Sequence, residues 1–323
     1  MHRKMAEDLE AIIPKTSYRP PILIRTFVDF IIETVNVGPE YGIKVTTVVE
    51  NYRAGFYSGF LFTLLVGYLV TINFVPFDHL QVIRDVFGTV NLCAYFDYPP
   101  STYIVPLIYV FPMLSMIAYN VASIVRINIA YGEQKISYLA RNLLVASHVY
   151  ILISAYCFLI IFEVAPDREY PITMVFHTLP YANFKIGFVV LQLSVVWFGS
   201  NVAWKDIGFS KAGLKLFVTL SWLHVIAMTV TTIVMTTVIF NGIGDMGPGG
   251  LVGKGLWWDV HDPPNNIVAL TNIFQNAAPL GDFWTAIVIP LLQSMILKFM
   301  SFRHVYKAQS VTFYILDNKS KDA

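Results

Sequence analysis

The chain has 323 residues, of which 56% are hydrophobic, 15% aromatic and 13% charged, and its formal net charge is +1. Soluble domains usually carry about 25% charged residues, so this composition excludes a soluble globular protein. It predicts an all-α, polytopic membrane protein.

The first 53 residues are expected to form a segment on the inner side of the membrane. The start of the chain is charged and lacks an apolar core, so we expect no cleavable signal peptide. Within residues 22–37, Arg25, Asp29 and Glu33 are spaced by four, which places them on one face of a helix. This pattern predicts an amphipathic helix on the membrane surface, and the three charged side chains are candidate partner contacts. A helix packed on a soluble partner is the alternative.

Six apolar runs follow, each long enough to cross about 30 Å of hydrocarbon as a helix. They are residues 54–75, 102–125, 143–165, 186–204, 214–240 and 283–300. Together they predict a six-span membrane domain, 54–304, followed by a short inner tail, 305–323. An even number of spans places both termini on the same side of the membrane.

The lysines and arginines indicate which side that is. Of the 22, all but four lie before the first run, in the connections after the second and fourth runs, or towards the end of the chain. The four exceptions, which we place in the opposite connections, are Arg84, Arg168, Lys185 and Lys254. Because inner loops are enriched in Lys and Arg, both termini are predicted on the cytoplasmic or matrix-equivalent side.

The outer connections offer neither a disulfide pair nor a glycosylation acceptor. Cys93 lies in an outer connection and Cys157 within the third run, so the two are not available to pair there. The one Asn-x-Ser/Thr match, at Asn318, lies in the inner tail. This combination favours an organellar or bacterial inner membrane, and an endolysosomal membrane is the alternative.

The longest outer connection, 241–282, is rich in glycine and proline and shows no regular periodicity. Trp257 and Trp258 within it suit the aromatic belt at a membrane interface. The alternative is that the two indoles dock to a partner protein, so they are also candidate partner contacts.

The fifth run carries His224 near its middle. Helical periodicity places one stripe towards other helices, made of Ser221, His224, Met228, Thr231 and Met235. Threonine hydroxyls can bond the carbonyl four residues back, so we interpret this run as structural. The alternative is haem ligation, in which His148 of the third run would supply the second imidazole. A proton relay is disfavoured, because we place no carboxylate deep in any run.

Other polar residues within the runs have structural interpretations as well. Gln192 is a polar residue within the fourth run. Pro290 is expected to bend the last span and to free a backbone carbonyl one turn earlier, with Gln293 nearby. Lys298 lies near the inner boundary, where its side chain can reach water, although a lysine that forms a Schiff base is an alternative. Broken helices at the prolines of the second run would suit a small transporter or channel.

A set of short matches resembles the damage-regulated autophagy modulator family of six-span membrane proteins. The matches are Pro76-Phe77, Tyr98-Pro99-Pro100, His177 followed by Phe184, and Gln309-Ser310-Val311-Thr312. The resemblance implies six spans with both ends inside, and a link to lipid handling. The long N-terminal segment and the enlarged last outer connection depart from the family's pattern.

These patterns contain no phosphate-binding glycine loop and no His/Cys cluster with metal-ligand spacing, so we expect no enzyme, metal or cofactor. The expected partners are the bilayer, bound phospholipid and other membrane subunits, but not nucleic acid. The function we predict is a non-catalytic accessory or scaffold subunit of a membrane assembly, with an organellar energy-transducing complex as its setting. A stand-alone lipid-handling or autophagy-type protein and a small transporter or channel are the alternatives.

Overall fold

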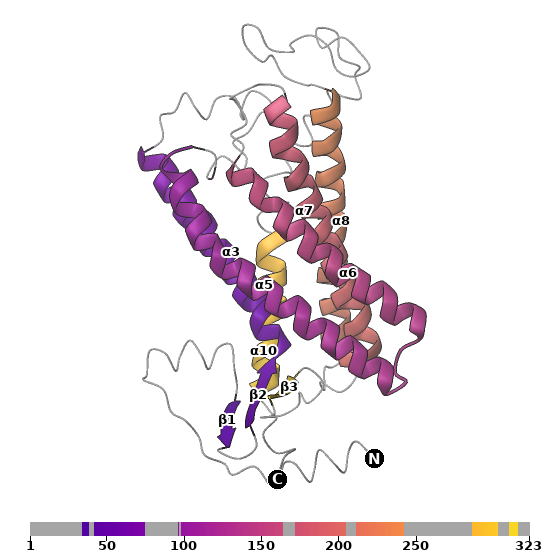
Figure 1. The fold of residues 1–323 in the computed structure, drawn as a ribbon. Coiled ribbons are helices and arrows are strands. Elements are labelled where there is room, and N and C mark those ends of the chain that lie inside the picture. The colour runs from indigo at the N-terminus through magenta and orange to yellow at the C-terminus, as the bar shows by residue number, and fades with distance from the viewer. Residues whose placement is uncertain are drawn as a thin grey trace, which may run out of the picture.

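The computed structural model describes residues 34–38, 42–74, 96, 98–163, 172–204, 211–241, 286–302 and 310–315 (Figure 1). Within these ranges, five helical segments are long and apolar enough to cross a membrane. They are α3 (Val49–Phe74), α5 (Ser101–Gly132), α6 (Tyr138–Cys157) continued by the 3-10 turn η3 (Phe158–Phe162), α7 (Ile172–Phe198) continued by the π turn η4 (Gly199–Ala203), and α8 (Lys211–Asn241). The prediction of a helical membrane protein is therefore confirmed.

The shorter apolar helix α10 (Ile289–Phe302) corresponds to the last predicted span, 283–300. Neighbouring helices along the chain pack against each other from α3 to α8, and α10 contacts both α8 and α3 (Figure 1). Helix α10 therefore closes the bundle between its first and last long helices.

A tight turn joins α5 to α6 and sets where α6 begins. Gln134 adopts a left-handed φ of 59°, and the amide of Lys135 donates to the carbonyl of Ala130 at 2.9 Å. These features terminate α5. Ser137 then caps α6, because its hydroxyl oxygen accepts from the amide of Ala140 at 3.3 Å.

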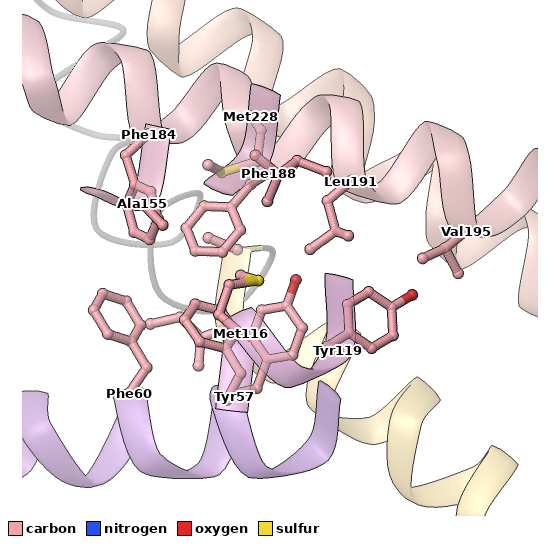
Figure 2. Close-up of a cluster of buried hydrophobic side chains, with 14 of the residues drawn as sticks. Tyr57, Phe60, Met116, Tyr119, Ala155, Phe184, Phe188, Leu191, Val195 and Met228 are labelled. Atoms are coloured by element: carbon pink, nitrogen blue, oxygen red, sulfur yellow. The ribbon is translucent and has the colours of Figure 1, made fainter. Parts of the chain in front are cut away.

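Aromatic rings fill the space between α3, α5, η3 and α7, and Figure 2 shows part of this cluster. The rings of Phe158 and Phe184 stack with centroids 4.3 Å apart, and those of Phe184 and Phe188 lie 4.5 Å apart. Phe60 of α3 places its ring edge-on to Phe158 and Phe184. We call this set the aromatic core; its members are Phe56, Tyr57, Phe60, Tyr109, Phe158, Phe184 and Phe188.

Two glycines allow neighbouring helices to approach closely. A Cβ atom added at Gly59 would lie 2.9 Å from the ring of Phe111, and one added at Gly187 would lie 3.0 Å from Cβ of Ser154. Gly59 thus sets the approach of α3 to α5, and Gly187 that of α7 to α6. Small residues at helix contacts are the usual means of tight packing in membranes, where apolar burial alone gives little drive.

A three-stranded antiparallel sheet lies at the end of the bundle where α3 begins (Figure 1). Its central strand, β2 (Gly42–Val48), pairs with β1 (Thr34–Gly38) on one side and with β3 (Ser310–Ile315) on the other. The prediction of a helix over 22–37 is therefore wrong for residues 34–37, which lie in β1. Three of the five residues in β1, Thr34, Val35 and Val37, are β-branched and favour a strand. Residues 22–33 lie outside the described part of the chain.

Helices α3 and α7 are among those that begin earlier than predicted, and the shift changes the position of charged residues. Helix α3 begins at Val49 instead of 54, so Glu50 and Arg53 belong to the first helix and not to the inner segment. Helix α7 begins at Ile172 instead of 186, so Lys185 lies within the fourth span and not in an outer connection. Lys185 is almost fully buried and lies 5.5 Å from the ring centroid of Tyr181.

Candidate functional site

Polar side chains from three helices meet one turn beyond the aromatic core along α7. Gln192 of α7 donates through Nε2 to Oγ of Ser221 on α8 at 2.9 Å and to Oε1 of Gln293 on α10 at 2.7 Å. Gln293 donates through Nε2 to the same Ser221 oxygen at 2.7 Å and to the carbonyl of Phe217 at 3.1 Å. All three side chains are fully buried. We call Gln192, Ser221 and Gln293 the polar seam.

The polar seam bonds the short helix α10 to α7 and α8. Hydrogen bonds between membrane helices contribute about 0.6 kcal/mol each on average. Several of them converge on one serine, and each amide nitrogen serves two acceptors. The sequence identified Gln192 and Gln293 as polar residues within the membrane but did not predict that they bond to each other. Lys298 also lies in α10, but its side chain is outside the described part of the structure.

The two histidines proposed as haem ligands lie on different helices, His148 on α6 and His224 on α8. Nδ1 of His148 lies 2.7 Å from Oδ1 of Asn120 on α5. Because the Asn120 amide nitrogen donates to the carbonyl of Met116, its oxygen is the acceptor, and Nδ1 of His148 carries the donated proton. His224 is fully buried on α8, and α7 packs against both α6 and α8. His148 is thus bonded to α5.

The stripe predicted around His224 is confirmed where side chains are described. Ser221, His224, Met228 and Thr231 are buried, whereas Leu223 is half exposed. The threonine hydroxyls bond within their own helix, as expected from their positions. The bonds run from Thr231 and Thr232 to the carbonyl of Met228, at 3.3 and 2.6 Å, and from Thr236 to that of Thr232 at 2.7 Å.

A buried ion pair at the start of α3 was not predicted. Nε of Arg53 lies 2.8 Å from Oε2 of Glu50, and both side chains are at most 2% exposed. Tyr57 and Tyr119 are close enough to interact electrostatically with the guanidinium group. The spacing of three within a helix would have suggested the pair, had the helix been predicted to begin before Glu50.

An open groove runs between α6 and α8, with α7 along its floor. Its volume is about 710 Å³. Apolar side chains, among them Leu143, Trp197, Val218 and Trp222, form most of its surface. Sequence reasoning did not predict this groove, because it depends on which faces of three helices meet.

The other candidate contact residues, Arg25, Asp29, Glu33, Trp257 and Trp258, lie outside the described part of the chain. Among the described residues, no group of three or more His, Cys, Asp or Glu side chains could hold a metal ion. No protein-family model, curated protein or solved structure matches the chain. The function must therefore be argued from the arrangement of the residues themselves.

Proposed function

We propose that this protein is a non-catalytic accessory or scaffold subunit of a multi-protein membrane assembly. The observation that carries the proposal is how the polar side chains of the bundle are used. The polar seam and the His148–Asn120 pair join helices, and the hydroxyls of Thr231, Thr232 and Thr236 bond within α8. Such bonds hold helices in place. A transporter or an electron carrier needs polar groups directed at a solute or cofactor instead.

The outer faces of the bundle suit contact with lipid and with other membrane subunits. Large apolar side chains such as Tyr103, Leu107, Tyr156 and Phe176 are exposed on α5, α6 and α7. In the sheet, β1 and β3 are the outer strands among the described residues, and a partner strand could pair with either of them. An organellar inner membrane as the location rests on the sequence argument from cysteines and glycosylation acceptors.

We also propose that the chain crosses the membrane six times, with α10 as part of the sixth crossing. The pairing of β2 with β3 supports this, because β2 precedes α3 and β3 follows α10. Two strands of one sheet lie on the same side of a membrane, so the number of crossings between them is even. Tags at both termini should be reachable from the same side only, and Cys93 should be labelled from the opposite side. Protection of one terminus alone would rule out the proposal.

The subunit proposal is tested by isolating the full-length protein from native membranes in a mild detergent. We expect it to co-migrate with other membrane proteins on a native gel. A variant that lacks residues 1–38, and with them β1, should insert normally but lose this association. Removal of residues 316–323, which follow β3, is the matched control and should retain it. A full-length chain that migrates as a monomer with bound lipid would contradict the proposal and favour the lipid-handling alternative.

A further inference from the structure

The groove between α6 and α8 has a surface that suits an apolar occupant. Five serines line it, yet each hydroxyl already serves its own helix. Those of Ser147, Ser194, Ser200 and Ser221 donate to carbonyls one turn earlier, at 2.6 to 3.0 Å, and that of Ser137 accepts from the α6 backbone. The serines therefore offer a ligand little free hydrogen-bonding capacity. The surface that the groove presents to an occupant is mainly that of its apolar side chains.

The length of the groove matches one leaflet of a bilayer. On α6 the lining extends from the capping residue Ser137 to Ser147. At 1.5 Å per residue this is about 15 Å, which is half of the roughly 30 Å hydrocarbon thickness. The groove therefore begins where α6 begins, at the end of the bundle, and reaches about the middle of the membrane. Its volume falls in the usual range for pockets that hold small molecules, about 300–1,000 Å³.

A charged stripe continues the groove at its open end. Val218, Trp222 and Val225 of α8 line the groove. Lys215 and Lys211 precede Val218 by three and seven residues, so they lie on the same face of the helix, one and two turns closer to the end of the bundle. Both lysine residues are exposed, and α8 contains no Asp or Glu. The same helix face thus changes from apolar to cationic along its length.

We propose that this groove binds an anionic phospholipid, with one acyl chain between α6 and α8 and the phosphate against Lys211 and Lys215. An acyl chain fits an apolar surface one leaflet deep, and the two ammonium groups lie where the headgroup of that leaflet would be. A transmembrane helix from another subunit would also fill an apolar groove. A helix as the occupant would not explain why Lys211 and Lys215 lie on the face of α8 that lines the groove. The proposal stands whether or not the protein is a subunit, because either kind of protein can retain such a lipid.

The test uses full-length protein in vesicles of phosphatidylcholine with a minor fraction of phosphatidylglycerol. Native mass spectrometry after gentle extraction then counts the lipids retained by each protein. We expect retained phosphatidylglycerol in excess of its fraction in the vesicle. Lys211→Gln and Lys215→Gln should each weaken its retention about fivefold, since a lysine near an anionic surface contributes about 1 kcal/mol. Lys135→Gln is the matched control, because Lys135 is exposed at the same end but pairs with Glu133. Lys135→Gln should leave the retention of phosphatidylglycerol unchanged.

A second pair of variants tests the acyl-chain site. Ala140→Phe and Ser147→Phe each place a ring in the groove, and both should reduce retention of phosphatidylcholine and phosphatidylglycerol alike. Val149→Phe, at an exposed position of α6 outside the groove, should not. Thermal unfolding of each variant establishes that it is folded; if one ring variant fails, the other provides the test.

Three results would overturn the proposal. The first is an equal loss of phosphatidylglycerol in Lys135→Gln and Lys215→Gln, which would indicate general surface charge. The second is unchanged lipid retention in a folded ring variant. The third is a photo-cross-link from position 147 to a polypeptide in place of a lipid in native membranes, which would show that another helix occupies the groove.

Discussion

The aromatic core and the polar seam lie next to each other along α7, yet they hold their helices by different means. The core joins α3, α5, η3 and α7 through ring contacts such as Phe158 on Phe184. The polar seam joins α7, α8 and α10 through directed bonds between Gln192, Ser221 and Gln293. Packing supplies contact area, whereas paired amides specify one register between helices. The short helix α10 is bonded to α7 and α8 by the second means and also packs against α3.

The largest effect is expected where a polar contact carries charge, at the start of α3. Glu50→Gln would leave Arg53 buried without its counter-ion, which destabilises proteins by about 3–5 kcal/mol. Unfolding in mixed detergent micelles should show this loss. Glu133→Gln, which breaks the exposed pair with Lys135, is the control and should change stability little. Equal effects of the two substitutions would mean that burial at Glu50 is unimportant.

Next in size is removal of a ring from the aromatic core. Phe184→Ala deletes contacts with Phe60, Phe158 and Phe188 and should lower the free energy of unfolding by about 3 kcal/mol. Phe176→Ala removes an exposed ring from the same helix, so its effect should be small. The same micelle unfolding experiment measures both. A larger loss at Phe176 would contradict the placement of the core.

Substitutions in the polar seam should lower the free energy of unfolding by less than these two. A double-mutant cycle isolates the interaction between its two amides. Gln192→Leu, Gln293→Leu and the double variant should give a coupling of about 1 kcal/mol, within the range found for hydrogen bonds between membrane helices. Because each amide bonds to the other and to Ser221, the two single losses should add up to more than the double loss. Strict additivity would show that the amides act independently.

The smallest change is expected for the single hydrogen bond between α5 and α6. Asn120→Ala should lower the free energy of unfolding by about 0.6 kcal/mol, because His148 Nδ1 then loses its acceptor. The purified wild-type protein should also show no Soret absorption. A haem band that disappears in both His148→Ala and His224→Ala would replace the structural interpretation of these residues with electron transfer.

The sequence predicted the long helices because each needs only a local run of apolar residues. The predicted start of α7 was too late, because Lys185 interrupts the apolar run. In the structure Lys185 lies within α7 and its side chain is buried. The polar seam was predicted only as separate residues. Its geometry depends on three helices distant in sequence. The sheet was missed for the same reason: β2 acquires its second neighbour from the far end of the described chain.

The pairing of β2 with β3 also has a consequence for biosynthesis. Strand β2 leaves the ribosome before α3, but β3 leaves it after α10. During synthesis β2 therefore has one edge without its final partner until all the helices between the two strands have been made. The sheet can be completed only after that point. A chain that stalls or is cut before β3 retains an unpaired strand edge, which a chaperone or protease can recognise as a sign of an incomplete protein.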